Sequence, residues 1–145
     1  LFKSAGFSFE YHYRPPPKLL REIYSSCDIY LCPSWYEGLG MPAMEAMACK
    51  SALVTTDTGG CRDYAIDGKT ALVSPAQDIE GLVKNLIHLL DNKSLLESIS
   101  KNEELILWRA YEIGLEAHKG QKRHSGKPYF THCSSVGVTL SKWKT

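Results

Sequence analysis

The feature that most constrains the fold is a glycine-rich stretch between an apolar run and an alanine-rich run. Residues 28–33 (DIYLCP) are typical of a buried strand, because they are few, largely apolar and closed by a proline that cannot stay in a central ladder. Residues 42–50 predict a helix, since proline is tolerated in the first turn and alanine favours the helix. Gly38 and Gly40 therefore lie in a strand-to-helix turn, where a ligand can approach the backbone closely.

The start of that helix is suited to a phosphate, because its first N–H groups are unpaired and its dipole is positive there. Two carboxylates flank the turn, with Glu37 on the loop and Glu45 in the first helical turn or just beyond it. Taken singly, these residues also have a structural explanation as turn glycines and as a favourable charge near a helix N-terminus. The residues alone leave both explanations open.

A second glycine-rich turn follows the next predicted strand. Residues 51–56 (SALVTT) predict a strand that ends in residues 57–60 (DTGG). A parallel α/β sheet brings the carboxyl ends of its strands to one edge, where the ligands of such sheets bind. We therefore expect both glycine-rich turns at the same edge.

Other segments continue the α/β pattern. Residues 7–13 alternate aromatic and polar side chains, which predicts a strand, and the prolines at 15–17 break it. Asp78 can cap a helix, and Asp91 with Asn92 would end it. Its predicted apolar face consists of Ile79, Leu82, Val83, Leu86, Leu89 and Leu90. The remaining predicted elements are a short amphipathic helix at 18–26, a strand at 71–73 after the Asp67–Gly68 turn, and a helical piece at 94–104.

Residues 33–48 (PSWYEGLGMPAMEAMA) closely resemble the signature of retaining glycosyltransferases with the GT-B fold, in particular the large GT4 family, in which two glutamates frame seven residues. The match extends over residues 20–53, and the Gly59–Gly60 pair followed by the Gly68–Thr70 turn fits the same family. The resemblance implies an α/β fold in which residues 1–103 form part of a Rossmann-like parallel sheet with flanking helices. This part would be the later half of a nucleotide-sugar-binding domain.

The resemblance also implies a donor and a set of site residues. The donor would be a nucleotide-diphospho-sugar (a UDP-, GDP- or ADP-sugar), used for glycosyl transfer with retention. Glu37, the catalytic residue, would contact the donor sugar near the reacting carbon, and Glu45 would bind the ribose hydroxyls. The nucleotide-sugar-binding residues would be Gly38, Leu39, Gly40, Glu45, Gly59 and Gly60. No metal cofactor is expected for the transfer, because the helix dipole and basic residues neutralise the diphosphate. In the family the arginine and lysine that grip the pyrophosphate precede anything that matches Leu1, so we expect a fragment with little or no catalysis.

From Leu105 the sequence changes in character. Residues 117–132 (AHKGQKRHSGKPYFTH) resemble the start of the HD-type hydrolase domain of RelA/SpoT alarmone enzymes, which implies a helical segment at 104–145. Arg123 would then stack on a guanine base, and His132 would be the first ligand of Mn²⁺. His124 and Cys133 replace the usual lysine and proline, and the other metal ligands would lie beyond Thr145. The alternative function is therefore hydrolysis of guanosine tetraphosphate, with Mn²⁺ only if that segment were complete. Without the family pattern, the basic run is an ordinary solvated loop.

Net charge, hydropathy and cysteine content limit the kinds of partner and the compartment that the sequence suggests. A net charge of +1 gives no general attraction to nucleic acid, and no apolar run is long enough to form a transmembrane segment. The five cysteines are odd in number and contain no C-x-x-C pair, which favours buried reduced thiols in a cytoplasmic protein. A third hypothesis is a non-catalytic nucleotide-binding or structural remnant that oligomerises through an exposed sheet edge.

Overall fold

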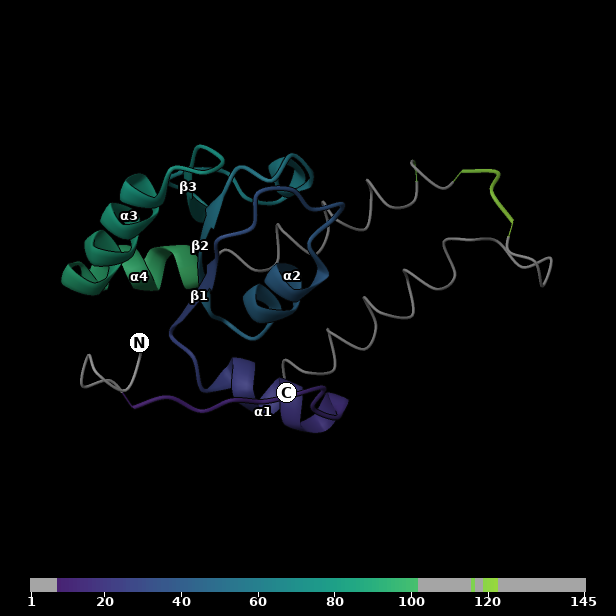
Figure 1. Cartoon of the computed structure of the whole chain (residues 1–145), viewed down its shortest axis with the longest axis horizontal. Coiled ribbons are helices and arrows are strands. Elements are labelled where there is room, and N and C mark those ends of the chain that lie inside the picture. Colours follow the sequence, from purple (N-terminus) through teal and green to yellow (C-terminus); the bar gives the residue numbers. More distant parts are fainter. Residues whose placement is uncertain (1–7, 102–115, 117–118, 123–145) are drawn as a thin grey trace.

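The computed structural model describes residues 8–101, 116 and 119–122. Within these residues a parallel sheet stands between helices on both of its faces (Figure 1). The elements in chain order are α1 (Pro17–Ser25), β1 (Ile29–Cys32), α2 (Met41–Ala48), β2 (Ala52–Thr56), the 3₁₀ helix η2 (Gly60–Asp63), β3 (Ala71–Ser74), α3 (Ile79–Asp91) and α4 (Lys93–Ser100). This is the predicted α/β class.

The sheet has the order β1-β2-β3, and both strand pairs are parallel. In the register, Leu53 of the central strand lies between Tyr30 and Ala71. All residues of β2 are buried, as expected for a parallel strand that is covered on both faces. The carboxyl ends of the three strands therefore share one edge, as predicted.

Alternate residues of β2 belong to two separate apolar clusters. Leu53 packs with Met44 and Met47 of α2, whereas Val54 packs with Leu82 and Leu89 of α3. Helix α4 joins the second cluster through Ile99, so α3 and α4 cover the face of the sheet opposite to α2 (Figure 1). Helix α1 packs against α2 through a third cluster that contains Tyr24, Ala46 and Cys49.

Local sequence signals account for several helix ends. Pro17 occupies the first turn of α1, where its missing N–H costs no helical hydrogen bond. The Asp78 carboxylate accepts a hydrogen bond from the Gly81 N–H at 2.9 Å and caps α3, as predicted. Asn92 ends α3 and caps α4 through the Leu95 N–H. The helices predicted at 18–26 and 42–50 and the strands predicted at 28–33, 51–56 and 71–73 are confirmed, with ends that differ by one or two residues.

The strand predicted at 7–13 is wrong. Residues 8–13 have no regular secondary structure, and Tyr11 and Tyr13 expose 80% and 71% of their surface. An alternating aromatic pattern forms a strand only when a neighbouring strand and a core receive its two sides, and among the described residues no strand pairs with residues 8–13.

The apolar face predicted for α3 is only partly right. Leu82 and Leu89 are buried, but Ile79, Val83 and Leu90 are exposed. The cysteine prediction is also only partly right: Cys49 and Cys61 are buried and outside any disulfide, whereas Cys27, also outside any disulfide, is exposed. Of the described helices, none combines the length and apolar character of a membrane span.

Candidate functional site

The turn before α2 depends on a glycine at its last position. Gly40 precedes the helix with a φ of 72°, a conformation that residues with a side chain rarely adopt. A Cβ atom at Gly40 would lie 2.5 Å from the hydroxyl oxygen of Tyr64, and that hydroxyl donates a hydrogen bond of 3.4 Å to the Gly40 carbonyl. Both the backbone and the neighbouring ring therefore require glycine there.

The two glycine-rich turns meet at the carboxyl edge of the sheet. Glu37 and Gly59 form an isolated parallel bridge, and the Glu37 N–H donates to the Thr58 carbonyl at 3.2 Å. The approach is so close that a Cβ on Gly60 would lie 1.3 Å from the Gly38 carbonyl oxygen. The prediction that both turns share one edge is confirmed, and the structure adds that they are in direct contact.

The head of α2 offers unpaired donors. Within residues 8–101, the backbone N–H groups of Gly38, Leu39 and Gly40 have no hydrogen-bond acceptor. Gly38 and Leu39 are also exposed. A helix of eight residues begins directly behind them, and its dipole adds a partial positive charge at this end. The turn can therefore hold an anionic group.

Glu37 is held in place by a chain of polar contacts. The Ser34 hydroxyl donates to Oε1 of Glu37 at 2.9 Å, and the thiol of Cys32 lies 3.7 Å from the Ser34 oxygen. The Thr56 hydroxyl, at the end of β2, donates to the Ser34 carbonyl. Because these contacts fix Oε1, the other carboxylate oxygen of Glu37 stays available to a ligand.

Glu45 is the fifth residue of α2, just beyond the first turn as predicted. It is half-buried, and this burial raises the pKa of its carboxyl above the ordinary value. Burial, followed by the nearby Cys32, Glu45 and Glu37, raises the pKa of the Tyr30 hydroxyl. Both carboxylates therefore add to the effect of burial on the Tyr30 hydroxyl of β1.

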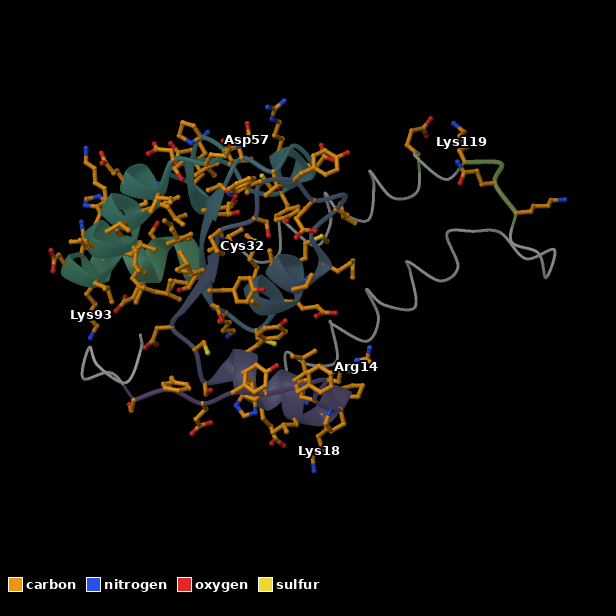
Figure 2. All side chains as sticks on the ribbon, in the orientation of Figure 1. Arg14, Lys18, Cys32, Asp57, Lys93 and Lys119 are labelled. Carbon is orange, nitrogen blue, oxygen red and sulfur yellow. The ribbon has the colours of Figure 1, made fainter. Side chains whose placement is uncertain are left out.

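The structure adds an ion pair at this edge that the sequence analysis missed. The Arg62 guanidinium donates through Nε and Nη2 to the Asp57 carboxylate, at 2.9 and 2.7 Å for the shorter contacts. The Gly59 N–H donates to the same carboxylate at 3.1 Å. Hydrogen bonds from Arg62 and Gly59 hold the pKa of the Asp57 carboxyl below its usual range. Figure 2 shows Asp57 beside these loops, at the end of the sheet away from Lys18 on α1.

Every glycosyltransferase-type site residue predicted from the sequence is described. Glu37, Gly38, Leu39, Gly40, Gly59 and Gly60 lie in the two joined turns, whereas Glu45 lies just beyond the first turn of α2. Their roles toward a donor stay predictions. Arg123 and His132 lie outside the described residues, so the guanine and Mn²⁺ roles suggested for them stay predictions as well.

Residues 8–105 match the family model of "Glycosyl transferases group 1". The chain is also similar to the crystal structure of the C-terminal domain of a group 1 family glycosyl transferase from Francisella tularensis. That likeness has a TM-score of 0.65 and 25% sequence identity, and it covers 76% of this chain and 58% of the other. The fold is therefore like that of a GT-B C-terminal domain.

Two curated relatives illustrate the range of similar proteins. The chain is 45% identical over 58 residues to an alpha-maltose-1-phosphate synthase of Mycolicibacterium smegmatis, which covers 40% of this chain and 15% of the relative. It is 31% identical over 105 residues to a D-inositol 3-phosphate glycosyltransferase of Corynebacterium aurimucosum, which covers 70% of this chain and 25% of the relative. The chain therefore matches about a quarter or less of the length of these two proteins.

Proposed function

Because this chain belongs to the group 1 family of glycosyl transferases, we propose that it binds a nucleotide-diphospho-sugar at the joined turns before α2. This site would serve retaining glycosyl transfer in a protein that also supplies an acceptor site. The observation that carries the proposal is the direct contact of the two turns, with unpaired N–H groups at the head of a helix and a glutamate on either side.

The proposed roles follow from the chemistry of each group. The N–H groups of Gly38, Leu39 and Gly40 face the diphosphate and the sugar, and they stabilise the diphosphate as it leaves. The Glu45 carboxylate accepts hydrogen bonds from the ribose hydroxyls, which a carboxylate does well because it has two acceptor oxygens. Glu37, with Oε1 occupied by Ser34, presents its other oxygen to the donor sugar. In this proposal the helix dipole takes the place of a metal ion.

Calorimetric titration of the chain with UDP-, GDP- and ADP-glucose tests the site. Hydrogen bonds to charged groups contribute about 1.5–3 kcal/mol, so we expect Glu45→Gln to weaken binding of the preferred donor roughly tenfold or more. Glu22 is an exposed glutamate on α1, away from the turns, and Glu22→Gln is the matched control. Absence of binding by the wild type, or equal affinity in Glu45→Gln, would contradict the proposal.

Titration with the free nucleotide diphosphate distinguishes the proposed roles of Glu37 and Glu45. Glu45→Gln should weaken both the nucleotide diphosphate and the nucleotide-sugar, because both contain the ribose. Glu37→Gln should weaken only the nucleotide-sugar, because its proposed contact is with the sugar. Equal losses for both ligands in Glu37→Gln would reassign that residue from the sugar to the turn itself.

A further inference from the structure

Helix α3 carries a second apolar stripe, which residues 8–101 leave uncovered. Ile79, Val83, Ile87 and Leu90 expose 72%, 47%, 51% and 67% of their surface. They recur at helical spacing, so they form one row beside the buried row that contains Leu82 and Leu89. Single exposed apolar residues are ordinary, but a continuous row on one helix marks an interaction surface.

This stripe is separate from the proposed donor site. Helix α3 packs on the face of the sheet opposite to α2 (Figure 1), whereas the glycine-rich turns lie at the carboxyl edge beside α2. A partner on the stripe therefore leaves the turns open.

One flank of the stripe carries a charge of each sign. Glu80 and Lys84 are one helical turn apart, and together with Ile79, Val83 and Ile87 they line a shallow hollow. Both charged residues are exposed, and in the described part of the chain neither forms an ion pair. The two groups are not in ion-pair contact with one another either, so this flank leaves one acidic and one basic group available to a partner.

We propose that the stripe pairs with the same stripe of a second copy of this chain, with the two α3 helices antiparallel about a two-fold axis near Val83. In that arrangement Ile79 of each copy meets Ile87 of the other, and the two Val83 side chains meet at the axis. In an antiparallel pair the same flank of each helix faces its counterpart. Each Glu80 then faces the Lys84 of the other copy with an axial offset of about 3 Å, which long side chains span.

The mixed charge favours this occupant over a membrane surface. A helix that lies on an anionic membrane carries lysine or arginine along its polar face, whereas this flank pairs one acidic with one basic group. In a two-fold dimer every contact occurs twice, so self-pairing forms two Glu80–Lys84 ion pairs and gives each charged group an opposite charge. A single helix buries far less than the roughly 800 Å² per partner of a standard interface, so the dimer should be weak and depend on concentration.

Sedimentation velocity of the full chain over a range of concentrations tests the proposal. We expect a monomer–dimer equilibrium that Glu80→Lys or Lys84→Glu alone weakens roughly tenfold, because each change replaces two attractive pairs by two repulsive ones. The double variant Glu80→Lys/Lys84→Glu should recover the wild-type equilibrium. Val83→Asp should abolish the dimer, while Tyr11→Asp, an exposed site outside the stripe, should not affect it.

A monomeric wild type at the highest concentration would overturn the proposal, and so would a double variant that fails to recover. Either result would show that the stripe does not pair with its own copy in this way. The charge variants lie at exposed positions, so they keep the test valid even if Val83→Asp fails to fold. Nucleotide-sugar titration of the double variant and of Val83→Asp should match the wild type, which keeps this proposal distinguishable from the donor site.

Discussion

At the scale of single residues, three glycines in the glycine-rich turns and at the start of η2 differ in how strictly the local geometry requires a glycine. Gly40 is required by its φ of 72° and by the Tyr64 hydroxyl. Gly60 has no positive φ, but its missing side chain makes room for the Gly38 carbonyl. Gly38 itself has no positive φ and nothing within 4 Å of an added Cβ. The joining of the turns therefore depends on Gly60, whereas the space beside Gly38 is open.

Gly60→Ala should destabilise the chain because the new methyl group would overlap the Gly38 carbonyl, which is backbone and cannot rotate away. Overpacking costs typically about 1–3 kcal/mol, so we expect a loss of that size in the free energy of unfolding, measured with urea and followed by circular dichroism. Gly38→Ala is the matched control and should change stability by less than about 0.5 kcal/mol. Equal losses in the two variants would mean that the turns do not meet as described.

The positions of Glu37 and Glu45 could be predicted from the sequence, because their spacing and the flanking strand and helix are local features. Tyr64 and Arg62 could not be predicted as partners of the site. Tyr64 reaches Gly40 across 24 positions of the chain, and no local pattern encodes such a contact. Asp57 follows β2 and Arg62 lies in η2, and a separation of five positions across the start of η2 matches no helical periodicity that would indicate their contact.

At the scale of elements, α3 shows what periodicity can and cannot establish. Its apolar residues at helical spacing predicted the helix correctly, and Asp78 predicted its cap. They form two adjacent rows, however, and the pattern does not say which row faces the sheet. Only the packing of β2 and β3 selects the row with Leu82 and Leu89. The same lack of tertiary information explains the strand wrongly predicted at 7–13, whose alternation had no sheet beside it.

In the first turn of α3, the capping carboxylate of Asp78 lies close to Gly81. A Cβ on Gly81 would lie 2.2 Å from the Asp78 carboxylate that caps the helix. Asp78→Ala should cost about 1 kcal/mol in thermal or urea unfolding, as loss of an N-cap usually does. Gly81→Ala should bring little or no gain in the wild type, because the helix-propensity gain is offset by displacement of the cap.

The same Gly81→Ala change should be stabilising in the Asp78→Ala background, by up to about 1 kcal/mol, because the carboxylate is then absent. The difference between the two backgrounds is the coupling energy of a double-mutant cycle. Asp78→Asn, which keeps an acceptor at the cap, serves as the control. Additive effects of the two alanine changes would show that the cap and Gly81 are independent.

At the scale of the whole molecule, the central strand β2 packs against α2, which follows the first glycine-rich turn, on one face and against α3 on the other. Leu53 and Val54 of β2 are adjacent in sequence and fully buried, yet each belongs to a different cluster. The two clusters are therefore joined by the backbone and hydrogen bonds of β2. Loss of packing beneath α3 should consequently reach the turns beside α2, because the sheet cannot unpair on one face alone.

Leu89→Ala tests that coupling, since Leu89 is 1% exposed and lies in the cluster beneath α3. Leucine-to-alanine changes in cores cost about 2–5 kcal/mol. Trp35 is the third residue after β1 and lies two residues before Glu37 of the first glycine-rich turn. The changes Trp108→Phe and Trp143→Phe leave it as the single tryptophan probe. If the described residues unfold as one cooperative unit, Leu89→Ala lowers the urea midpoint equally when unfolding is followed by Trp35 fluorescence and by far-ultraviolet circular dichroism.

Leu90→Ala, at the exposed neighbouring position, is the control and should leave both midpoints nearly unchanged at concentrations where the chain is monomeric. A Trp35 transition that stays at the wild-type midpoint while the dichroism transition shifts would show that the two faces unfold separately, and that the donor turns do not depend on the packing of α3.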